Sequence, residues 1–480
     1  MSRPQAHRPA ADSASLSQRY PGLAGELAAL AARARPTDLL SLCLPAPPLP
    51  IAGPLPYIAA PDSLAWQRPD DAWLALGAAC TVESAGPGRF TALNGAWQGL
   101  AARWQIAAMS QDSDGSDDLQ APLAHLGFAF YDASGDSPLP NARLRVPALL
   151  LRRRAGRQTL VLTCPAHGAA QAMAGWEALW QTLERTLLSQ PAPLAALHLQ
   201  RPPAPLPEQA FVARTRAALA AIARGELDKV VLSRRVAFEA DSPLEAAAVF
   251  AALAAQQADS SVFAVGHRAG TFLGATPERL LSLQDGRLHT EALAGTGWGR
   301  ADAPLTSDKN QREHGWVAEA IRHTLAPLCA ELQAAPAEVL QLPGGRRHAG
   351  LSHLRTPFHG RPAPGVGLFD LAARLHPTPA VGGWPAAPAR EWLQAHGEER
   401  PLWYSGGLGW IDAAGNGTLA VPLRCADLRG NRAELQAGAG IVAGSAAEQE
   451  LAETEAKLAT MLEALAPSAP APAAASRRGA

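Results

Sequence analysis

Two spacings of apolar residues alternate along this chain, and they predict a mixture of strands and helices. The segments "HLGFAFYDAS" at 125–134 and "RQTLVLTCP" at 157–165 alternate apolar and small residues, which is typical of strands. Residues 173–189, "MAGWEALWQTLERTLLS", repeat apolar residues three and four positions apart, as an amphipathic helix does. The first half therefore predicts a sheet covered by helices, without a motif that indicates chemistry.

The second half begins with a helix and continues with strands. Pro207 and Glu208 favour a helix start, and Gly225 favours its end. The apolar positions between them are Phe211, Val212, Ala218, Leu219 and Ile222. "DKVVLSRRVAF" at 228–238 predicts a strand, and "SVFAVGHRAGTFLGATPERLLSL" at 261–283 predicts a hairpin. Because strand and helix signals mix without a regular βαβ rhythm, the sequence favours an α+β fold.

The composition is that of a globular protein. The 480 residues are 48% hydrophobic and 18% charged, with a formal net charge of -1, which is enough apolar surface for a core. This near-neutral balance argues against a nucleic-acid partner, and no run of about 18 apolar residues indicates a membrane span. The five cysteines are scattered without CxxC spacing, and no signal peptide precedes them. We therefore expect buried thiols in a reducing cytoplasm.

Three segments of biased composition divide the chain. Residues 1–20 lack periodicity and predict a disordered N-terminal arm, and the Pro/Ala-rich residues 466–480 predict a disordered tail. "LQRPPAPLP" at 199–207 predicts a Pro-rich connection. These boundaries leave a first part at 21–198 and a second part at 208–465.

Two ionisable residues stand at the ends of predicted strands. Lys229 shares a strand face with Val231 and Ser233. It is either a solvated strand-end lysine or a partly buried amine whose pKa falls until it can act as a base. Glu278 follows the tight backbone of "GATP". It is either a turn carboxylate or a carboxyl that apolar surroundings keep protonated, so that it can act as an acid.

Acidic residues interrupt the apolar stripes of two predicted helices. The first stripe consists of Glu313, Val317, Ile321 and Leu325. A carboxylate on a core-facing stripe must find a cation, and a salt bridge is the simplest one. In "EQELAETEAKLATML", Glu450, Glu453 and Lys457 share one helix face. They form either a solvated ion-pair face or, beside Glu313, an all-oxygen site that suits Mg²⁺.

Three loop features could bind or shape a ligand. "LHPTPAVGGWP" cannot form a regular helix, and it holds His376 in a rigid wall of small residues. "AGAGIV" leaves the N–H groups of Gly438 and Gly440 free for a carboxylate or phosphate, although a GxG pattern alone is a weak signal. Tyr404 and Arg424 are either an anion clamp or surface residues.

Eight stretches between about Leu227 and Leu465, taken in order, resemble the chorismate-utilising enzymes. They are "LDKVVLSR", "FLGATPERLL", "EALAGT", "DKNQREH", "SHLRT", "LHPTPAVGG", "YSGGLGWID" and "AGAGIVAGS" with "ELAETEAKL". One such match is weak, but eight in register are specific. The resemblance implies a fold of two layered antiparallel β-sheets flanked by helices. Residues 21–198 would be its variable N-terminal part, and 208–465 would be its chorismate-binding catalytic part.

The resemblance also implies the reaction, which is the Mg²⁺-dependent isomerisation of chorismate to isochorismate. Water attacks C2, the C4 hydroxyl leaves, and the ring double bonds shift. Because water is a poor nucleophile, Lys229 would be the general base. Because hydroxide is a poor leaving group, Glu278 would be the general acid. Relatives that use ammonia carry Gln at position 229, and some carry Lys where this chain has Ala294. Both positions therefore indicate water.

The resemblance assigns the remaining site residues. Mg²⁺ on Glu313 and Glu453, with Glu450 close or water-bridged, would bind the ring carboxylate, and Lys457 would neutralise the excess acid. The substrate contacts would be Gly295, Thr296, His376, Ala380, Tyr404, Arg424, Gly438 and Gly440. Two residues depart from the family pattern. Asn310 stands where some relatives have an acid near the metal, and Glu291 replaces a proline common before "LAGT".

Two other functions stay open from the sequence. Salicylate synthases form isochorismate and then eliminate pyruvate, and they tend to carry Thr or Ser and Val where this chain has Pro379, Ala380 and Val381. A non-catalytic chorismate-binding protein would not need both an acid and a base. We expect a cytoplasmic monomer that acts on chorismate without nucleic acid, membrane or glutaminase subunit. Its product could serve siderophore, menaquinone or salicylate biosynthesis.

Overall fold

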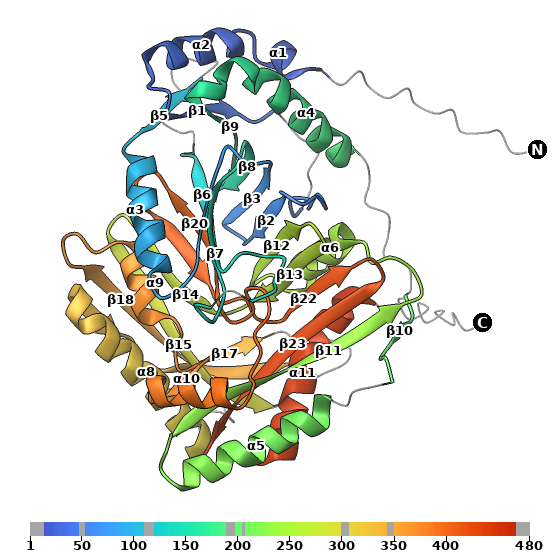
Figure 1. Cartoon of the computed structure of the whole chain (residues 1–480), viewed down its shortest axis with the longest axis vertical. Coiled ribbons are helices and arrows are strands. Elements are labelled where there is room, and N and C mark those ends of the chain that lie inside the picture. The colour runs from blue at the N-terminus through green and yellow to red at the C-terminus, as the bar shows by residue number, and fades with distance from the viewer. Residues whose placement is uncertain are drawn as a thin grey trace, which may run out of the picture.

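Two large β-sheets form the centre of the chain (Figure 1). A computed structural model describes residues 14–47, 53–109, 120–133, 135–188, 197–203, 207–298, 307–342 and 350–466. The first sheet has 13 strands and the second has 10. Strand pairs are antiparallel throughout the described residues except for one parallel pair at an edge.

The first sheet has the order β10-β11-β23-β22-β13-β12-β2-β3-β8-β9-β1-β5, and β19 pairs with β11 beside it. Its strands are β1 (Leu39–Pro45), β2 (Leu64–Gln67), β3 (Asp71–Leu76), β5 (Trp104–Ala108), β8 (Leu149–Arg154), β9 (Arg157–Pro165), β10 (Leu199–Gln200), β11 (Lys229–Ala240), β12 (Ser261–His267), β13 (Gly270–Thr276), β19 (Gly383–Trp384), β22 (Cys425–Arg429) and β23 (Arg432–Val442). The parallel pair is β1 with β5.

The second sheet has the order β16-β18-β15-β14-β21-β20-β6-β7-β4, and β17 also pairs with β18. Its strands are β4 (Cys80–Ser84), β6 (Leu123–Phe128), β7 (Ala142–Val146), β14 (Arg279–Gln284), β15 (Arg287–Trp298), β16 (Cys329–Ala334), β17 (Glu338–Leu342), β18 (Leu351–Pro362), β20 (Gly407–Asp412) and β21 (Gly417–Ala420). Both sheets therefore combine strands from the two halves of the sequence.

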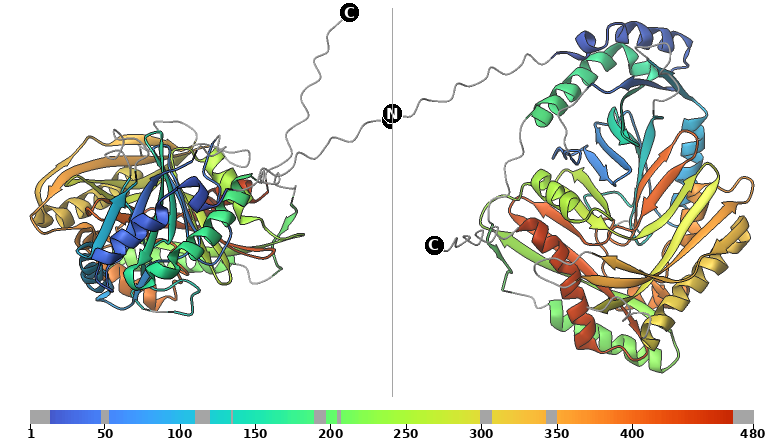
Figure 2. Two further views of the ribbon diagram at one scale, coloured as in Figure 1. Left: turned by 90° about the horizontal axis from the view of Figure 1, so that it is seen from above. Right: turned by 180° about the vertical axis from the view of Figure 1, so that it is seen from behind.

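Helices cover the outer faces and ends of both sheets. They are α1 (Leu16–Arg19), α2 (Leu23–Arg33), α3 (Arg89–Ala101), α4 (Ala169–Leu188), α5 (Pro207–Ala223), α6 (Ala246–Gln256), α8 (Asp308–Leu325), α9 (Leu368–Leu375), α10 (Ala386–Ala395) and α11 (Ala447–Leu465), with short 3₁₀ turns η2 (Ala166–Gly168) and η3 (Ala326–Leu328). Helices α2 and α4 pack on β1 and β9, whereas α5 and α11 pack on β11 and β23. The view from behind in Figure 2 shows α5 and α11 side by side at that end.

Buried aromatic residues fill the space between the sheets. Trp66 and Trp73 of the first sheet belong to one buried cluster with Trp403 and Trp410, which lie just before and on β20 of the second sheet. Gly127 of β6 leaves room for this packing, because a Cβ there would lie 2.2 Å from the Trp403 ring. Interlocking of this kind makes the two sheets one packed unit.

The structure confirms the α+β prediction and most of the predicted elements. Helix α5 begins at Pro207 and buries Phe211 and Ala218, and strands β11, β12 and β13 lie where the period-two pattern indicated. The end of the stretch predicted as a hairpin, from Arg279 onward, instead crosses into the second sheet as β14. No helix in the described ranges is both long and apolar enough to cross a membrane.

Three predicted boundaries differ from the structure. Part of the expected N-terminal arm is ordered, because Ser15 caps α1 and Leu16 is buried against α4. In the Pro-rich connection, Leu199 and Gln200 form β10. Ala466 packs at the end of α11. Residues 1–13, 204–206 and 467–480 lie outside the described residues.

Candidate active site

The chain crosses between the two sheets at two places, and each crossing carries a charged residue. Glu278 lies between β13 of the first sheet and β14 of the second. Arg424 lies between β21 of the second sheet and β22 of the first. The crossings are bonded to each other, because Val421 N–H donates to the Glu278 carbonyl at 3.0 Å and Ala275 N–H donates to the Arg424 carbonyl at 3.2 Å. Glu278 and Arg424 are therefore fixed next to each other at the seam, that is, where the chain passes from one sheet to the other.

Glu278 is a buried carboxyl with a strongly shifted pKa. Burial, followed by the charge of Glu291, raises this pKa from 4.5 to about 7, while the charges of Lys229, Lys457 and Arg424 oppose the shift. Desolvation disfavours the charged form of a carboxyl. Glu278 is thus partly protonated near neutral pH, which is what a general acid requires.

Arg424 adopts a backbone conformation that is unusual for a side-chain-bearing residue. Its φ is 46°, and Ser405 and Leu402 nearby have φ values of 52° and 56°. Left-handed backbone at such residues is costly and concentrates at functional sites. The guanidinium of Arg424 is buried, and burial lowers its pKa to about 10, with the charge of Glu278 acting against that shift.

The β11–β23 pair brings the predicted base and the glycine motif together. Val231 lies opposite Gly440, and Ser233 lies opposite Gly438. A Cβ on Gly440 would lie 2.4 Å from Oε1 of Glu313 and 3.1 Å from Cε of Lys229. Only glycine at position 440 leaves room for these side chains, so β23 and α8 can approach the lysine closely.

Three carboxylates at the site each bind a lysine. Nζ of Lys229 lies 2.9 Å from Glu313 Oε1, and the side chain of Lys229 is only 1% exposed. Nζ of Lys457 donates to Glu453 Oε1 at 2.7 Å and to the Gly438 carbonyl at 2.8 Å. Burial acts to raise the pKa of Glu453, but the Lys457 ammonium and its hydrogen bond outweigh burial and lower this pKa.

The third pair is Glu450 with Lys309, a residue that sequence analysis had not singled out. Nζ of Lys309 donates to Glu450 Oε1 at 2.5 Å. Glu450 is almost fully buried. Burial, followed by the charge of Glu453, raises the pKa of Glu450, and Lys309 opposes this shift.

The donor chemistry of these carboxylates fits a divalent cation. Among the described residues, no group of three or more His, Cys, Asp or Glu side chains is arranged to hold a metal ion. The ammonium of Lys309, however, interacts electrostatically with Glu450, Glu313 and Glu453 at once. The three carboxylates therefore attract one cation together, and carboxylate oxygens are ligands that Mg²⁺ prefers.

The Pro/Gly-rich wall is attached to the strand that carries Lys229. Gly383 and Trp384 pair with Val230 and Lys229, and Val231 N–H donates to the Gly382 carbonyl at 2.9 Å. Ala380 and Val381 line the cavity that the wall closes. The wall therefore presents small apolar side chains to this cavity, as the sequence indicated.

His376 does not take the position that the sequence suggested. Its ring lies between Phe128 and Phe130, and Nε2 lies 2.9 Å from the Ser405 carbonyl. Burial lowers its pKa to about 3, so the ring is neutral and donates this hydrogen bond. His376 is absent from the cavity lining. It supports the wall from behind and is not placed to contact a ligand.

A cavity of about 80 Å³ collects most of the predicted residues. Its lining includes Glu278, Gly295, Thr296, Glu313, Ala380, Tyr404, Arg424, Gly438, Gly440, Glu453 and Lys457. Lys229 and Glu450 lie just outside the lining and are bonded to Glu313 and Lys309. The volume is below the roughly 300 Å³ of a typical small-molecule site. The paired side chains therefore fill this cavity and must rearrange to admit a ligand.

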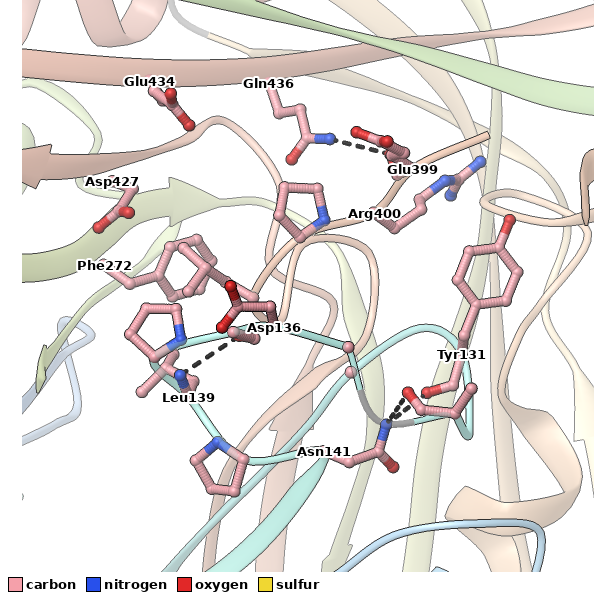
Figure 3. Close-up of a pocket in the computed structure, with 18 of the residues that line it drawn as sticks. Tyr131, Asp136, Leu139, Asn141, Phe272, Glu399, Arg400, Asp427, Glu434 and Gln436 are labelled. Atoms are coloured by element: carbon pink, nitrogen blue, oxygen red, sulfur yellow. Dashed lines mark hydrogen bonds between the residues drawn. The ribbon is translucent and has the colours of Figure 1, made fainter. Parts of the chain in front are cut away.

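A larger cavity of about 1080 Å³ adjoins this one but carries none of the predicted site residues. Figure 3 shows its side chains, including Tyr131, Asn141 and Gln436. The two cavities share Arg400 and Gln436. Although the neighbouring cavity is larger, the smaller one is the candidate active site, because it contains the charged residues and the Glu278 carboxyl with its raised pKa.

Sequence analysis missed two ionisable residues of the cavity lining, His353 and Arg400. His353 lies 3.4 Å from both Thr296 Oγ1 and Arg424 Nη2, and burial beside Arg424 lowers its pKa to about 3. It stands in the quoted "SHLRT" stretch, which could have indicated it. Arg400 donates to the carbonyls of Val231 and Val381 at 2.7 Å each. No pattern in its loop indicates this buried role.

Comparisons with known proteins extend the likeness to both halves of the chain. The family described as chorismate binding enzyme matches residues 28–466. The salicylate biosynthesis isochorismate synthase of Pseudomonas aeruginosa is 33% identical over 429 residues, which cover 84% of this chain and 84% of that protein. Isochorismate synthase DhbC of Bacillus subtilis is 35% identical over 280 residues, which cover 55% of this chain and 69% of that protein.

Solved structures agree with these sequence matches. MenF, the menaquinone-specific isochorismate synthase from Escherichia coli, superposes with a TM-score of 0.71 at 28% identity, covering 92% of this chain and 98% of that one. Anthranilate synthase component I from Streptococcus pneumoniae gives a TM-score of 0.62 at 20% identity over 86% of this chain and 92% of that one. The second likeness concerns the fold alone.

Proposed function

Because this chain belongs to the chorismate-binding enzymes, we propose that it is an isochorismate synthase. It isomerises chorismate by adding water at C2 and releasing the hydroxyl from C4. The observation that carries the proposal is a carboxyl, Glu278, whose pKa is about 7, in one cavity with Arg424 and two lysine-bound carboxylates. Similar proteins with this name support the same reaction.

Glu278 is the general acid of this reaction. Its buried carboxyl retains a proton near neutral pH and delivers it to the departing C4 hydroxyl. Hydroxide is a poor leaving group, whereas water leaves readily, so this proton transfer lowers the barrier. The hydrogen bonds between the two crossings hold the backbone of Glu278 in place while it acts.

Lys229 is the general base that accepts a proton from the attacking water. Its side chain enters the site beneath Gly440, and its Nζ is bonded to Glu313. Lys229 is held at the start of β11, which pairs with β23 from Lys229 to Glu239. A water molecule is a weak nucleophile without such a base.

Positive and hydrogen-bonding groups bind the two carboxylates of chorismate. Arg424 and Tyr404, with the backbone of Gly438 and Gly440, hold the enolpyruvyl carboxylate, since all four line the cavity. Thr296, which donates to Glu453 at 3.1 Å, contacts the ring side of the substrate together with Gly295. Ala380 and Val381 leave a flat apolar flank for the ring.

Glu313 and Glu453 would hold Mg²⁺, with Glu450 as a third carboxylate close by. The ion would supply positive charge that binds the ring carboxylate of chorismate. Lys457 keeps Glu453 oriented through its ion pair and its bond to the Gly438 carbonyl. The protein acts on free water, so it needs no ammonia-supplying partner.

Chromatography of the products tests the proposal directly. Purified protein is incubated with chorismate and Mg²⁺ in the absence of ammonia. Isochorismate as the product supports the proposal. Salicylate with pyruvate would indicate a salicylate synthase, and unchanged chorismate would indicate a non-catalytic binding protein. Either of the last two results overturns it.

A further inference from the structure

Lys309 is a cation at a helix N-terminus, where a positive charge is unfavourable unless carboxylates stabilise it. It lies in the first turn of α8, after the cap Ser307. The partial positive charge at a helix N-terminus disfavours a cation at this position. The helix therefore does not stabilise the Lys309 ammonium. The acidic residues that it contacts do.

Three carboxylates attract the Lys309 ammonium, and one of them lies at hydrogen-bond distance. It is bonded to the buried Glu450 at 2.5 Å, and the carboxylates of Glu313 and Glu453 add to this attraction. Two of these residues, Glu313 and Glu453, line the small cavity from α8 and α11. The ammonium thus joins the two helices that supply the acidic groups.

We propose that Lys309 is a built-in counter-cation that occupies the metal position of this acidic cluster and withdraws toward solvent when Mg²⁺ binds. This inference rests on the proposed function, because it takes Mg²⁺ as the ion of the site. Each of the three carboxylates is paired with a lysine side chain, in the pairs Lys229–Glu313, Lys457–Glu453 and Lys309–Glu450. An additional divalent charge makes one ammonium redundant in a poorly hydrated cavity.

Lys309 is the ammonium that can leave. The Lys229 side chain is 1% exposed, and Lys457 has a second bond to the Gly438 carbonyl. The Lys309 side chain is 28% exposed. Because Glu450 is buried, it needs a cation in either state, and an exchange of Lys309 for Mg²⁺ supplies one.

Chemical labelling of the unaltered protein tests the exchange without relying on turnover. An amine-acylating reagent is applied in EDTA and in saturating MgCl₂, with NaCl added to match ionic strength, and modification of each lysine is quantified by peptide mass spectrometry. We expect Lys309 to react several-fold faster in Mg²⁺. An unchanged rate at Lys309 would overturn the proposal, whether or not the protein converts chorismate.

The variant Lys309→Met tests the same competition by binding. We expect calorimetry to give a Mg²⁺ affinity about tenfold higher or more, since the variant has no internal cation to displace. In EDTA its Tm should fall, because Glu450 is left buried without a cation, and Mg²⁺ should restore Tm more than in the unaltered protein. Arg312→Met, which removes an exposed cation from the same helix, should change neither quantity.

A weaker or equal Mg²⁺ affinity in Lys309→Met would contradict the proposal, because it would mean that Lys309 organises the site for the metal. If this variant does not fold, the Mg²⁺ affinity of Lys309→Gln and the labelling experiment test the same exchange. Absence of Mg²⁺ binding to the unaltered protein would also overturn the inference. The reaction itself is judged separately, by the products formed from chorismate.

Discussion

The pKa of Glu278 gives a prediction about how turnover depends on pH. Burial raises this pKa from 4.5 to about 7. At pH 7 a carboxyl with the ordinary value is roughly 0.3% protonated, whereas one at about 7 is roughly half protonated, an increase of more than 100-fold in the acid form. If Glu278 donates the proton, kcat/KM should fall as pH rises above 7, since this ratio reports groups of the free enzyme.

Replacing Glu291 with Gln should move this pH dependence. The negative charge of Glu291 is the second cause of the raised pKa of Glu278, after burial. Removing the charge should lower the pH at which kcat/KM falls by about 0.5 to 1 pH unit, as expected for one nearby like charge. Burial remains, so the midpoint should stay well above 4.5. The assay is the initial rate of isochorismate formation at pH 5.5–9 and subsaturating chorismate.

Glu338→Gln is the matched control for this experiment. Glu338 and Glu291 both pair with Arg355, but Glu338 is exposed on β17 and is not among the charges that shift Glu278. The control should keep the midpoint of the unaltered protein. The acid assignment is refuted if kcat/KM is flat from pH 6 to 8.5 in the unaltered protein. It is also refuted if both variants have the same midpoint.

Three further predictions concern the base, the metal and the stability of the protein. Lys229→Ala should lower kcat by about 10²–10⁴ while chorismate still binds, and a loss below tenfold would contradict its role. EDTA should abolish turnover and Mg²⁺ should restore it; Glu313→Gln and Glu453→Gln should need more Mg²⁺, and full activity in excess chelator would exclude the metal. Glu278→Gln should be more stable to urea than the unaltered protein by about 3 kcal/mol at pH 8, because a pKa raised on folding costs stability as pH rises from 4.5 to 7. That gain should vanish at pH 4.5, and an equal gain at both pH values would show another cause.

Local spacing in the sequence was enough to predict the elements that carry the site. The period-two pattern placed Lys229 at the start of a strand, and it does begin β11. The period of 3.6 placed Glu313 on a stripe with Val317 and Ile321, which α8 buries. These predictions succeed because the direction of a side chain depends on its position within its own element. The family motifs then indicated which of these residues share one site.

Other features depend on contacts between distant segments and could not be predicted from local spacing. Glu278 and Arg424 are 146 residues apart, and they meet only because the chain crosses between the sheets at both places. His376 stood in the expected wall, but the packing of Phe128 and Phe130 turned it away from the cavity. Local periodicity carries no information about which strand pairs with which, so it could not predict these positions.

The charges at the site show the same division between sequence and tertiary structure. Sequence determined that Glu313 lies on a core-facing stripe and that Glu450 and Glu453 share one helix face, because helix periodicity sets the face of each residue. Only the folded chain decided which cation each carboxylate meets, including Lys309, which local pattern did not single out. The pKa of Glu278 is likewise decided by burial at the seam between two sheets. Desolvation and pairing depend on every element packed around a group, and these elements come from both halves of the chain.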